Sequence, residues 1–484
     1  MIRLTFLGMF LSVIIIYSWR DWYKSLCGLI LLMAFTEHPD MPKTMLGIQG
    51  LNPWNIGLFF VLLSWVLNRG REKLSWDMPR HIKYLLLLYF AVVLVGFFRM
   101  VSDQGEAEKL LGEGLFSEYL INSIKWVIPG LLLFHGCNSR SRLMIGLASL
   151  LGLYFLLGVQ VIRWMPPGAA ITGQTLSERS RKIILNEIGY HRVNLSMMLA
   201  GASWAVFAFR PMLKKRGLLV FIIVMAALSL VYAQALTAGR AGYVTWGVVG
   251  LILCTIRWRK YLLFAPILVI AITLAIPGVV ERMSQGFTRE TRDTNPKIEE
   301  IYKSDPDEPD MYTILAGRNI AWPFIIDKID ESPFIGYGRL AMVRTGLKSF
   351  LWEKFGESFP HPHNAYLEML LDNGWIGFLI VIPFYVIILW QSISLFRDSR
   401  SFVFVAIGGV TCALVLALLV ASMGSQTFYP REGSVGMWCA IGLMLRVYVE
   451  RKRVSSLNRG ISGQDFENAL WARPARKKRK KFDF

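Results

Sequence analysis

Charge is scarce in this sequence, and so is cysteine. Asp, Glu, Lys and Arg make up only 18% of the 484 residues, whereas 54% are hydrophobic. A soluble chain of this length alternates apolar and polar residues around its cores, so this composition argues against a soluble protein. The five cysteines lie in or beside apolar stretches, and their spacing matches neither a zinc ribbon nor a redox pair. We expect small packing residues at Cys27, Cys137, Cys254, Cys412 and Cys439.

Long apolar blocks are what the sequence has in abundance. Most run for about 17 to 23 residues, the length that crosses a bilayer as a helix. Unbroken runs exclude the alternating pattern of a membrane barrel, so the predicted fold is an all-α polytopic membrane protein. We predict 12 or 13 transmembrane helices, the lower number applying if the first two form one broken element. The first block lacks a small-residue cleavage site, so a retained helix is expected rather than a signal peptide. The predicted spans are 3–18, 22–36, 53–68, 82–100, 119–137, 142–162, 193–209, 217–236, 240–256, 260–279, 374–396, 402–424 and 433–449.

Short loops alternate in charge along the chain. The loops "NSRSR", "RPMLKKR", "RWRK" and "RDSR" are basic, whereas the loops between them include the acidic "SDQGEAEKLLGEGLFSE" and the nearly neutral "SQTFYPREG". The loop over 163–192 is basic although it is expected to be external, an exception to the charge rule. The positive-inside rule places the basic set in the cytoplasm. From Arg446 onward the chain has twelve Lys or Arg and four Asp or Glu, which predicts a cytoplasmic C-terminus. We expect this tail to contact anionic membrane lipids and not nucleic acid.

The chain is therefore predicted to have four parts: a bundle of about ten spans over 1–279, a large external loop over 280–373, C-terminal transmembrane helices over 374–449 and a basic tail over 450–484. The loop precedes the third-last helix and is too long to be a mere connection. Its second half, "AGRNIAWPFIIDKIDESPFIGYG", has helical spacing and then a turn-rich stop, which predicts a packed subdomain. The acidic stretch "DPDEPD" before it is expected to be a solvated turn and not a metal site.

The stretch "SFPHPHNAYLEMLLDNGWIGFLIV" brings titratable residues directly against an apolar run. Because Pro362 can occupy the first turn of a helix, we predict a helix from about His361 to Asn373, with His363 and Leu367 on one face. A neutral imidazole at the membrane surface can act as a general base near pH 7, since its unperturbed pKa is about 6.5. The alternatives are a histidine that only caps the helix, and a metal site begun by the two histidines.

Three arginines also lie on the predicted outer side of the membrane, against the charge bias. They are Arg192 in "GYHRVNLS", Arg240 in "LTAGRAGYV" and Arg318 in "LAGRNIAWPF". Snorkelling or an ion pair with a loop carboxylate is one explanation. The functional alternative is phosphate recognition, because a guanidinium presents a fixed fork of donors that matches phosphate oxygens. Arginines around a histidine favour a site where a phosphorylated lipid meets a nucleophile that must lose a proton.

These segments resemble the O-antigen ligase and polymerase superfamily. The sequence "HNAYLEMLLDNGWIG" fits its H-[NSQ]-x9-G-x-x-G signature through His363, Asn364, Gly374 and Gly377. The segment "LTAGRAGYVTWGVVGLIL" is similar to its T-x-S-R-G/A segment, with Gly239 where serine is usual. The segment "AGRNIAWPFIIDKIDESPFIGYG" resembles its R-x-x-x-W … P-x-x-G-x-G segment. More loosely, "GYHRVNLSMMLAG" resembles a G-x-x-x-x-N segment, in which Val193 replaces the usual proline. The resemblance covers about residues 180–450.

The resemblance implies a glycosyltransferase of the bacterial inner membrane whose active site faces the periplasm. Such an enzyme moves a glycan from undecaprenyl diphosphate to a sugar hydroxyl, commonly on lipid A–core, without a metal or another cofactor. By motif position, Arg240 and Arg318 would bind the donor diphosphate and His363 would be the base. Further substrate-binding candidates are Arg181, Arg192, Asn194, His361 and Asn364.

Several functions remain open at this stage. Within the class, the alternatives are a repeat-unit polymerase of O-antigen or exopolysaccharide and a protein O-oligosaccharyltransferase, so the acceptor is lipid A–core, a growing glycan or a protein. A lipid or glycan transporter is the alternative from another class. A transporter predicts internal repeats and mid-membrane charges, whereas the polar residues here gather at one face.

Overall fold

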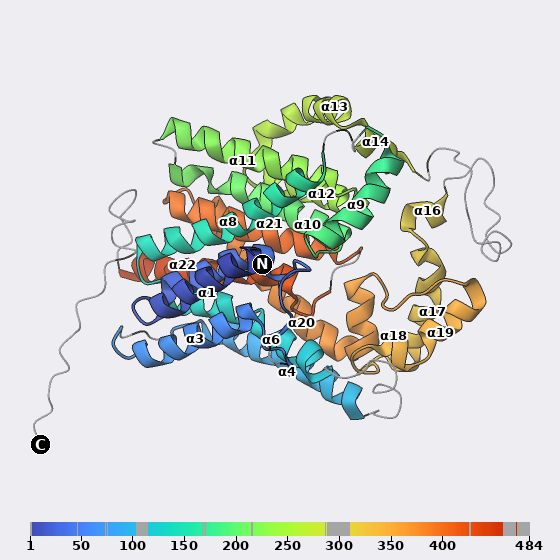
Figure 1. Cartoon of the computed structure of the whole chain (residues 1–484), viewed down its shortest axis with the longest axis horizontal. Helices are drawn as coiled ribbons and strands as arrows, with labels where there is room; N and C mark the ends of the chain where they lie inside the picture. The colour runs from blue at the N-terminus through green and yellow to red at the C-terminus, as the bar shows by residue number, and fades with distance from the viewer. Residues whose placement is uncertain are drawn as a thin grey trace, which may run out of the picture.

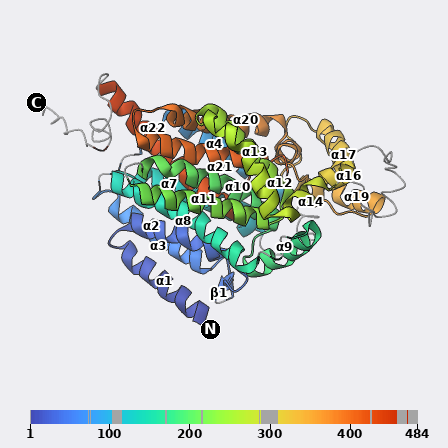
Figure 2. The same ribbon diagram turned by 90° about the horizontal axis from the view of Figure 1, so that it is seen from above.

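The computed structural model describes residues 2–45, 47–72, 74, 76–102, 115–166, 168, 171–213, 216–285, 287, 310–424, 427–457 and 471. It is an all-α polytopic membrane protein, as predicted, with one short antiparallel hairpin of β1 (Thr44–Met45) and β2 (Ile48–Gln49) beside the helices. Within the described residues, six helices are long and apolar enough to cross a membrane, and four apolar helices of 10–17 residues accompany them. Figures 1 and 2 show these helices packed side by side in one bundle.

Each predicted span falls on a helical element of the bundle. Its main helices are α1 (Ile2–Ser18), α2 (Trp22–Thr36), α3 (Pro53–Asn68), α4 (Arg80–Ser102), α7 (Ile128–Gly136), α8 (Arg140–Trp164), α10 (Arg192–Phe209), α11 (Gly217–Leu236), α12 (Arg240–Ile256), α13 (Ala265–Ala275), α20 (Ala365–Arg397), α21 (Phe402–Ala421) and α22 (Val435–Leu457). The five cysteines are free and buried, as expected of packing residues.

Two predicted spans are not continuous helices. The span 119–137 divides into the π-helical η1 (Phe116–Ile121), α6 (Asn122–Lys125) and α7, and Pro129 lies in the first turn of α7. The span 260–279 divides into η4 (Arg259–Phe264), α13 and α14 (Pro277–Ser284), with Ile276 outside the helical region. Proline lacks an N–H and pushes the preceding residue toward extended backbone, so it starts a new helix more readily than it continues one.

The bundle is built around α21, against which α10, α12, α20 and α22 pack. In its most apolar stretch 83% of α21 is buried inside the protein, compared with 28% for α11, which therefore lies at the periphery. Small side chains allow close helix packing: a Cβ added at Gly130 of α7 would lie 2.2 Å from the Trp438 carbonyl oxygen of α22. Such contacts are typical of membrane helices, whose association depends on van der Waals packing.

A separate lobe sits at one end of the bundle, at the right of Figure 1. It comprises α16 (Met311–Leu315), α17 (Arg318–Glu331), α18 (Ala341–Arg344) and α19 (Leu347–Phe355). Its own apolar core includes Ile320, Ile325, Leu351 and Phe355, and Leu371 of α20 joins it. Most of the acidic stretch around 102–118, the segment 288–309 with most of "DPDEPD", and most of the predicted tail 450–484 lie outside the described residues.

Candidate active site

The histidine segment is a loop that leads into α20, and the helix predicted from His361 is wrong in its starting point. The helix begins at Ala365, because the Asn364 side chain caps it by accepting hydrogen bonds from the backbone N–H groups of Tyr366 (3.0 Å) and Leu367 (3.3 Å). His363 has a positive φ of 53°, which no α-helix contains. His363 and Leu367 therefore do not share a helix face, and Asn364 has a structural role that its position in the motif did not indicate.

The loop holds His363 in a defined place. Its backbone N–H donates to Nδ1 of His361 at 3.3 Å, and the two imidazole rings lie 4.0 Å apart. The indole of Trp322 donates to the Pro362 carbonyl oxygen at 3.1 Å, which ties α17 to the histidine loop. Nδ1 of His363 is buried and has no hydrogen-bond partner among the described residues. A buried polar atom without a partner in the free protein is a natural contact for a substrate.

The surroundings of the histidines disfavour their charged form. Burial, together with the nearby His361, Arg318 and His191, lowers the pKa of His363 to about 3. Burial also lowers the pKa of His361, against the opposing effect of Glu368. The unperturbed pKa of about 6.5 therefore does not apply to His363. At neutral pH the imidazole is uncharged and can accept a proton.

Glycines join the turn at the end of α17 to the first half of α20. Gly374 interrupts the helical backbone of α20 with φ 62° and ψ −169°. A Cβ at Gly374 would lie 2.2 Å from the Phe334 carbonyl carbon, and one at Gly336 would lie 2.5 Å from the Leu371 oxygen. The Trp375 N–H then donates to the Pro333 oxygen at 2.8 Å. Gly336 of the arginine segment and Gly374 of the histidine segment are thus the points where the two segments touch.

The two arginines assigned to the donor differ in their contacts. Arg318 is the first residue of α17. It is half-buried, and its guanidinium has no hydrogen-bond or ion-pair partner among the described residues. Arg240 begins α12 and donates to the backbone oxygens of Thr313 (2.6 Å) and Gln285 (3.4 Å). Arg240 therefore bridges the two ends of the long connection between α14 and α16, a structural role that the sequence did not reveal. The two side chains are close enough to repel each other electrostatically.

The weaker candidates lie around the start of α10. Arg192 donates to the Ser177 carbonyl and hydroxyl oxygens (3.2 and 3.0 Å) and to the Ser180 hydroxyl (3.2 Å), which attaches α9 (Gly173–Glu187) to the bundle. Arg181 is exposed on α9. Oδ1 of Asn194 is buried without a partner among the described residues. Arg192 lies within electrostatic range of Arg181 and of Arg240.

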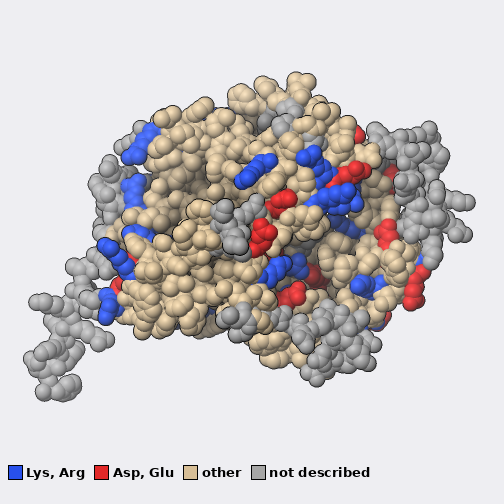
Figure 3. Space-filling view, viewed as in Figure 1, with Lys and Arg blue, Asp and Glu red and all other residues tan. Residues whose placement is uncertain are grey.

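Two residues of this region were missed by the sequence reasoning. Arg282 of α14 interacts electrostatically with Arg240 and Arg181, donates to the Gln285 side chain, and has a buried Nε without a partner in the described part of the chain. His191, next to Arg192, lies within electrostatic range of both histidines of the loop. Another arginine against the charge bias, in "GVVERMS", was the available signal for Arg282. Figure 3 shows Lys and Arg side chains gathered over α9 and α14, beside the lobe.

Helix termini strengthen the positive potential of this cluster. Arg192, Arg240 and Arg318 are the first residues of α10, α12 and α17. A helix N-terminus carries a partial positive charge and free N–H groups, so a cation there is unfavourable and an anion is favoured. Neither this cluster nor any other group of described residues brings together three His, Cys, Asp or Glu side chains that could hold a metal ion. The arrangement can bind a doubly charged anion with arginines and present a neutral imidazole beside it.

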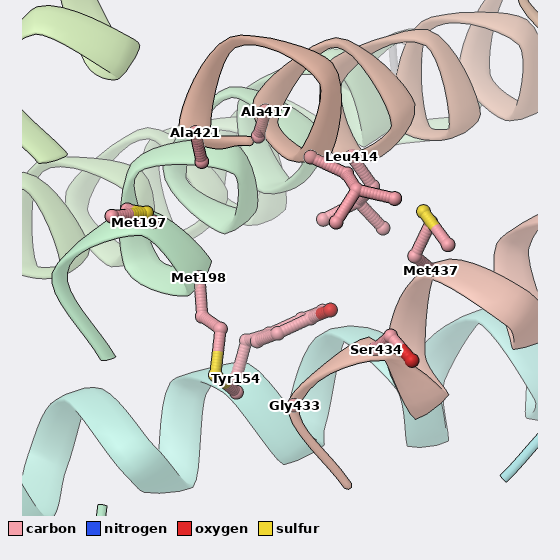
Figure 4. Close-up of a pocket in the computed structure, with 10 residues that line it drawn as sticks. Tyr154, Met197, Met198, Leu414, Ala417, Ala421, Gly433, Ser434 and Met437 are labelled. Atoms are coloured by element: carbon pink, nitrogen blue, oxygen red, sulfur yellow. The ribbon is translucent and has the colours of Figure 1, made fainter. Parts of the chain in front are cut away.

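A small cavity lies within the bundle, and none of the clustered arginines or histidines lines it. Figure 4 shows it between α8, α10, α21 and the start of α22, where Tyr154, Met197, Met198, Leu414 and Met437 line it. Its volume is about 40 Å³ and its walls are largely apolar. Such a space reflects imperfect packing of helices rather than a substrate pocket. We therefore define the candidate site by the side chains of the histidine loop and the arginine cluster, and not by this cavity.

Residues 225–382 match the family model described as O-antigen ligase. The matched segment runs from α11 into α20 and contains Arg240, Arg318 and His363, whereas Arg181, Arg192 and Asn194 precede it. The resemblance to O-antigen ligases that the motifs predict is therefore confirmed for this third of the chain. The class that fold and match define together is a multi-pass membrane protein with an O-antigen ligase segment.

A curated relative carries a compatible name. The chain is 26% identical over 175 residues to a protein of Rickettsia conorii (strain ATCC VR-613 / Malish 7) named "Putative polysaccharide ligase". The similarity covers 34% of this chain and 37% of that protein. The chain thus aligns with little more than a third of the length of this relative.

Proposed function

We propose that this protein is a glycosyltransferase of the bacterial inner membrane. It moves a glycan from undecaprenyl diphosphate to a sugar hydroxyl of lipid A–core at the periplasmic face. The observation that carries the proposal is the meeting of three motif segments: Trp322 of the arginine segment is hydrogen-bonded to the histidine loop, and Arg318 lies within electrostatic range of both His363 and Arg240. An uncharged imidazole beside unpaired guanidinium groups suits a diphosphate leaving group and an alcohol nucleophile.

The proposed reaction is a single displacement at the anomeric carbon. The acceptor oxygen forms the new bond to that carbon while its proton passes to the His363 imidazole. The bond between the anomeric carbon and the bridging phosphate oxygen breaks, and undecaprenyl diphosphate leaves with the electron pair. Arg318 and Arg240 stabilise the charge that grows on the leaving diphosphate, the task that a divalent cation performs in other transferases. One displacement without a carboxylate nucleophile inverts the anomeric configuration.

The sidedness of the site follows from the charge pattern. Basic loops lie at the other ends of α10, α12 and α20, and the positive-inside rule assigns those ends to the cytoplasm. A cysteine at the exposed Ser349 of α19, in a chain otherwise free of cysteine, is expected to react with a membrane-impermeant thiol reagent once the outer membrane is permeable. A cysteine at Arg259, at the other end of the bundle, serves as the control. Labelling of Ser349→Cys only after lysis of the inner membrane would reverse the assignment.

The central test is turnover by the purified full-length protein in detergent. With an undecaprenyl diphosphate-linked glycan and lipid A–core, we expect transfer with inversion, and equal rates in EDTA and in added Mg²⁺. A requirement for Mg²⁺ or Mn²⁺ would contradict diphosphate binding by arginine alone. Parallel reactions with donor alone and with an acceptor protein separate the branches of the family. Chains that lengthen without lipid A–core would identify a polymerase, and a modified protein would identify an oligosaccharyltransferase.

A further inference from the structure

An open basic cavity of about 820 Å³ lies at the end of the bundle opposite the candidate active site. Three of its cations lie at the C-terminal ends of helices that start at the candidate site. Arg210 follows α10, Arg257 follows α12, and Arg397 is the last residue of α20. Lys260, in η4, is the fourth cation of the lining.

The cavity holds its cations in place by contacts that leave other donors free. Nη1 of Arg210 donates to the Tyr261 hydroxyl at 3.0 Å, and the guanidinium stands over Phe207 at 4.3 Å. Nη1 of Arg257 donates to the Phe396 carbonyl oxygen at 2.9 Å. Both side chains are thus fixed by neutral groups. Asp398 attracts Arg257 electrostatically, but neither guanidinium forms an ion pair within the described residues, so each can bind an anion at little further entropic cost.

The carboxylate nearest to this region is already paired. Asp398 receives Nη2 of Arg400 at 2.7 Å and Nε of Arg451 at 2.9 Å, and neither arginine lines the cavity. The lining residues include four cations and no Asp or Glu. The positive charge of the cavity is therefore not balanced by its own walls.

The remaining walls are apolar and belong to membrane helices. Val220 of α11, Ile256 of α12 and Val405 of α21 line the cavity, together with Phe402, which is 42% exposed. Trp258 and Tyr261 stand among the cations, and both residue types are favoured at membrane–water interfaces. A free phosphate ion gains nothing from apolar walls, whereas a lipid uses both the cations and the walls.

We propose that this cavity binds the headgroup of an anionic phospholipid from the adjacent membrane leaflet. The phosphate contacts the guanidinium groups of Arg257 and Arg397 and the ammonium group of Lys260, while the glycerol and the first acyl carbons lie along α11 and α21. Basic pockets between transmembrane helices are suited to such headgroups. The bound lipid joins the far ends of α10, α12 and α20, the helices that carry or follow the candidate active-site residues. This site is independent of the proposed transfer reaction.

Native mass spectrometry of the full-length protein, titrated with phosphatidylglycerol, tests the proposal. The double variant Lys260→Gln/Arg397→Gln changes exposed side chains for which no hydrogen bond is seen within the described residues, so it is expected to fold. We expect the Kd for phosphatidylglycerol to rise about fivefold per lost cation, or roughly 25-fold in the double variant. Arg216→Gln/Arg259→Gln removes the same charge outside the cavity and is expected to change the Kd less than about threefold.

Two further titrations identify the ligand. Phosphatidylcholine is expected to bind the wild-type protein at least about tenfold more weakly than phosphatidylglycerol, because its headgroup is neutral overall. Inorganic phosphate at millimolar concentration is expected to leave the thermal midpoint unchanged, while phosphatidylglycerol raises it. Equal binding of the two lipids, an equal loss in the control variant, or equal stabilisation by free phosphate would each overturn the proposal.

Discussion

The arginines at the two ends of the bundle are treated differently by their surroundings. At the end opposite the lobe, Arg142 lies 2.6 Å from Glu72, and Arg446 lies 2.7 Å from Asp77 and 3.4 Å from Glu450. At the lobe end, none of the clustered arginines forms an ion pair within the described residues; they contact backbone oxygens, hydroxyl groups, the Gln285 amide oxygen or no described partner. These clustered arginines are Arg181, Arg192, Arg240, Arg282 and Arg318.

Under the proposed function, the arginines paired with carboxylates stabilise the fold, whereas the clustered arginines, which have no carboxylate partner among the described residues, bind the donor diphosphate. A paired arginine is neutralised by its carboxylate and fixed in one geometry. Unpaired arginines repel one another, and three of those at the lobe end also stand at helix N-termini, where positive charge is unfavourable. An anion removes both penalties at once. The basic cavity differs again, because its arginines lie at helix C-termini, where the helix dipole already favours them, so its ligand should matter less.

Loss of the base should have the largest effect. His363→Ala is expected to lower the single-turnover transfer rate by about 10²–10⁴-fold, the usual contribution of a positioned base. Donor affinity should change less than about threefold, because the arginines remain. His361→Ala is the matched control: it changes the neighbouring ring and should cost less than about tenfold. Transfer at a near-normal rate in His363→Ala would leave the histidine as a structural residue of the loop and remove the general-base mechanism.

Separation of the lobe from α20 should have the next largest effect. A Cβ at Gly374 meets the Phe334 and Ile335 backbone at 2.2–2.4 Å, so Gly374→Ala is expected to cost more than about 3 kcal/mol of stability. Gly346 also has a positive φ, of 75°, but nothing lies within 4 Å of its Cβ position. Gly346→Ala should therefore cost only about 1 kcal/mol of backbone strain. Thermal unfolding in detergent and proteolysis of the lobe measure the stability loss in each variant. Equal effects would mean that the contact with Phe334 is not needed.

The sequence predicted the fold better than it predicted the contacts of the site. Apolar run length located most helices of the bundle, because an unbroken apolar run in lipid satisfies its backbone N–H and C=O groups by forming a helix. It failed where proline divides a run, at Ile276 and before α7. The motif segments located His363, Arg240 and Arg318, but no local pattern indicates that Arg240 bridges Gln285 and Thr313. That contact depends on tertiary packing.

Exchange of arginine for lysine sharpens the comparison between the two ends. Arg318→Lys keeps the charge and loses the fork of donors, so we expect donor affinity to fall about tenfold with little change in stability. Arg142→Lys makes the same chemical change at an ion pair with Glu72, and we expect stability to fall by about 1 kcal/mol while donor affinity stays the same. Donor titration gives the donor affinity of each variant, and thermal unfolding gives its stability. If Arg318→Lys loses stability and keeps its affinity, Arg318 belongs to the class of structural arginines.

The smallest effect concerns pH, and it tests whether the unpaired arginines act on the base. Burial together with His361, Arg318 and His191 lowers the pKa of His363 to about 3, so the imidazole stays unprotonated well below pH 6.5. We expect kcat/KM, which reports the free enzyme, to stay nearly constant from pH 8 to pH 5. An enzyme whose catalytic histidine had an ordinary pKa would lose about thirtyfold in kcat/KM over that range.

The donor diphosphate adds negative charge beside the ring and favours the imidazolium, so the pKa of His363 in the complex should rise. The acidic limb of kcat should therefore lie at higher pH than that of kcat/KM. Arg318→Gln removes one positive neighbour of His363 and should move the kcat/KM limb toward higher pH. Lys348→Gln removes one positive charge from the half-buried Lys348 of α19 and should leave the limb in place. A kcat/KM limb near pH 6.5 in the wild-type enzyme would mean that the arginine cluster does not act on His363.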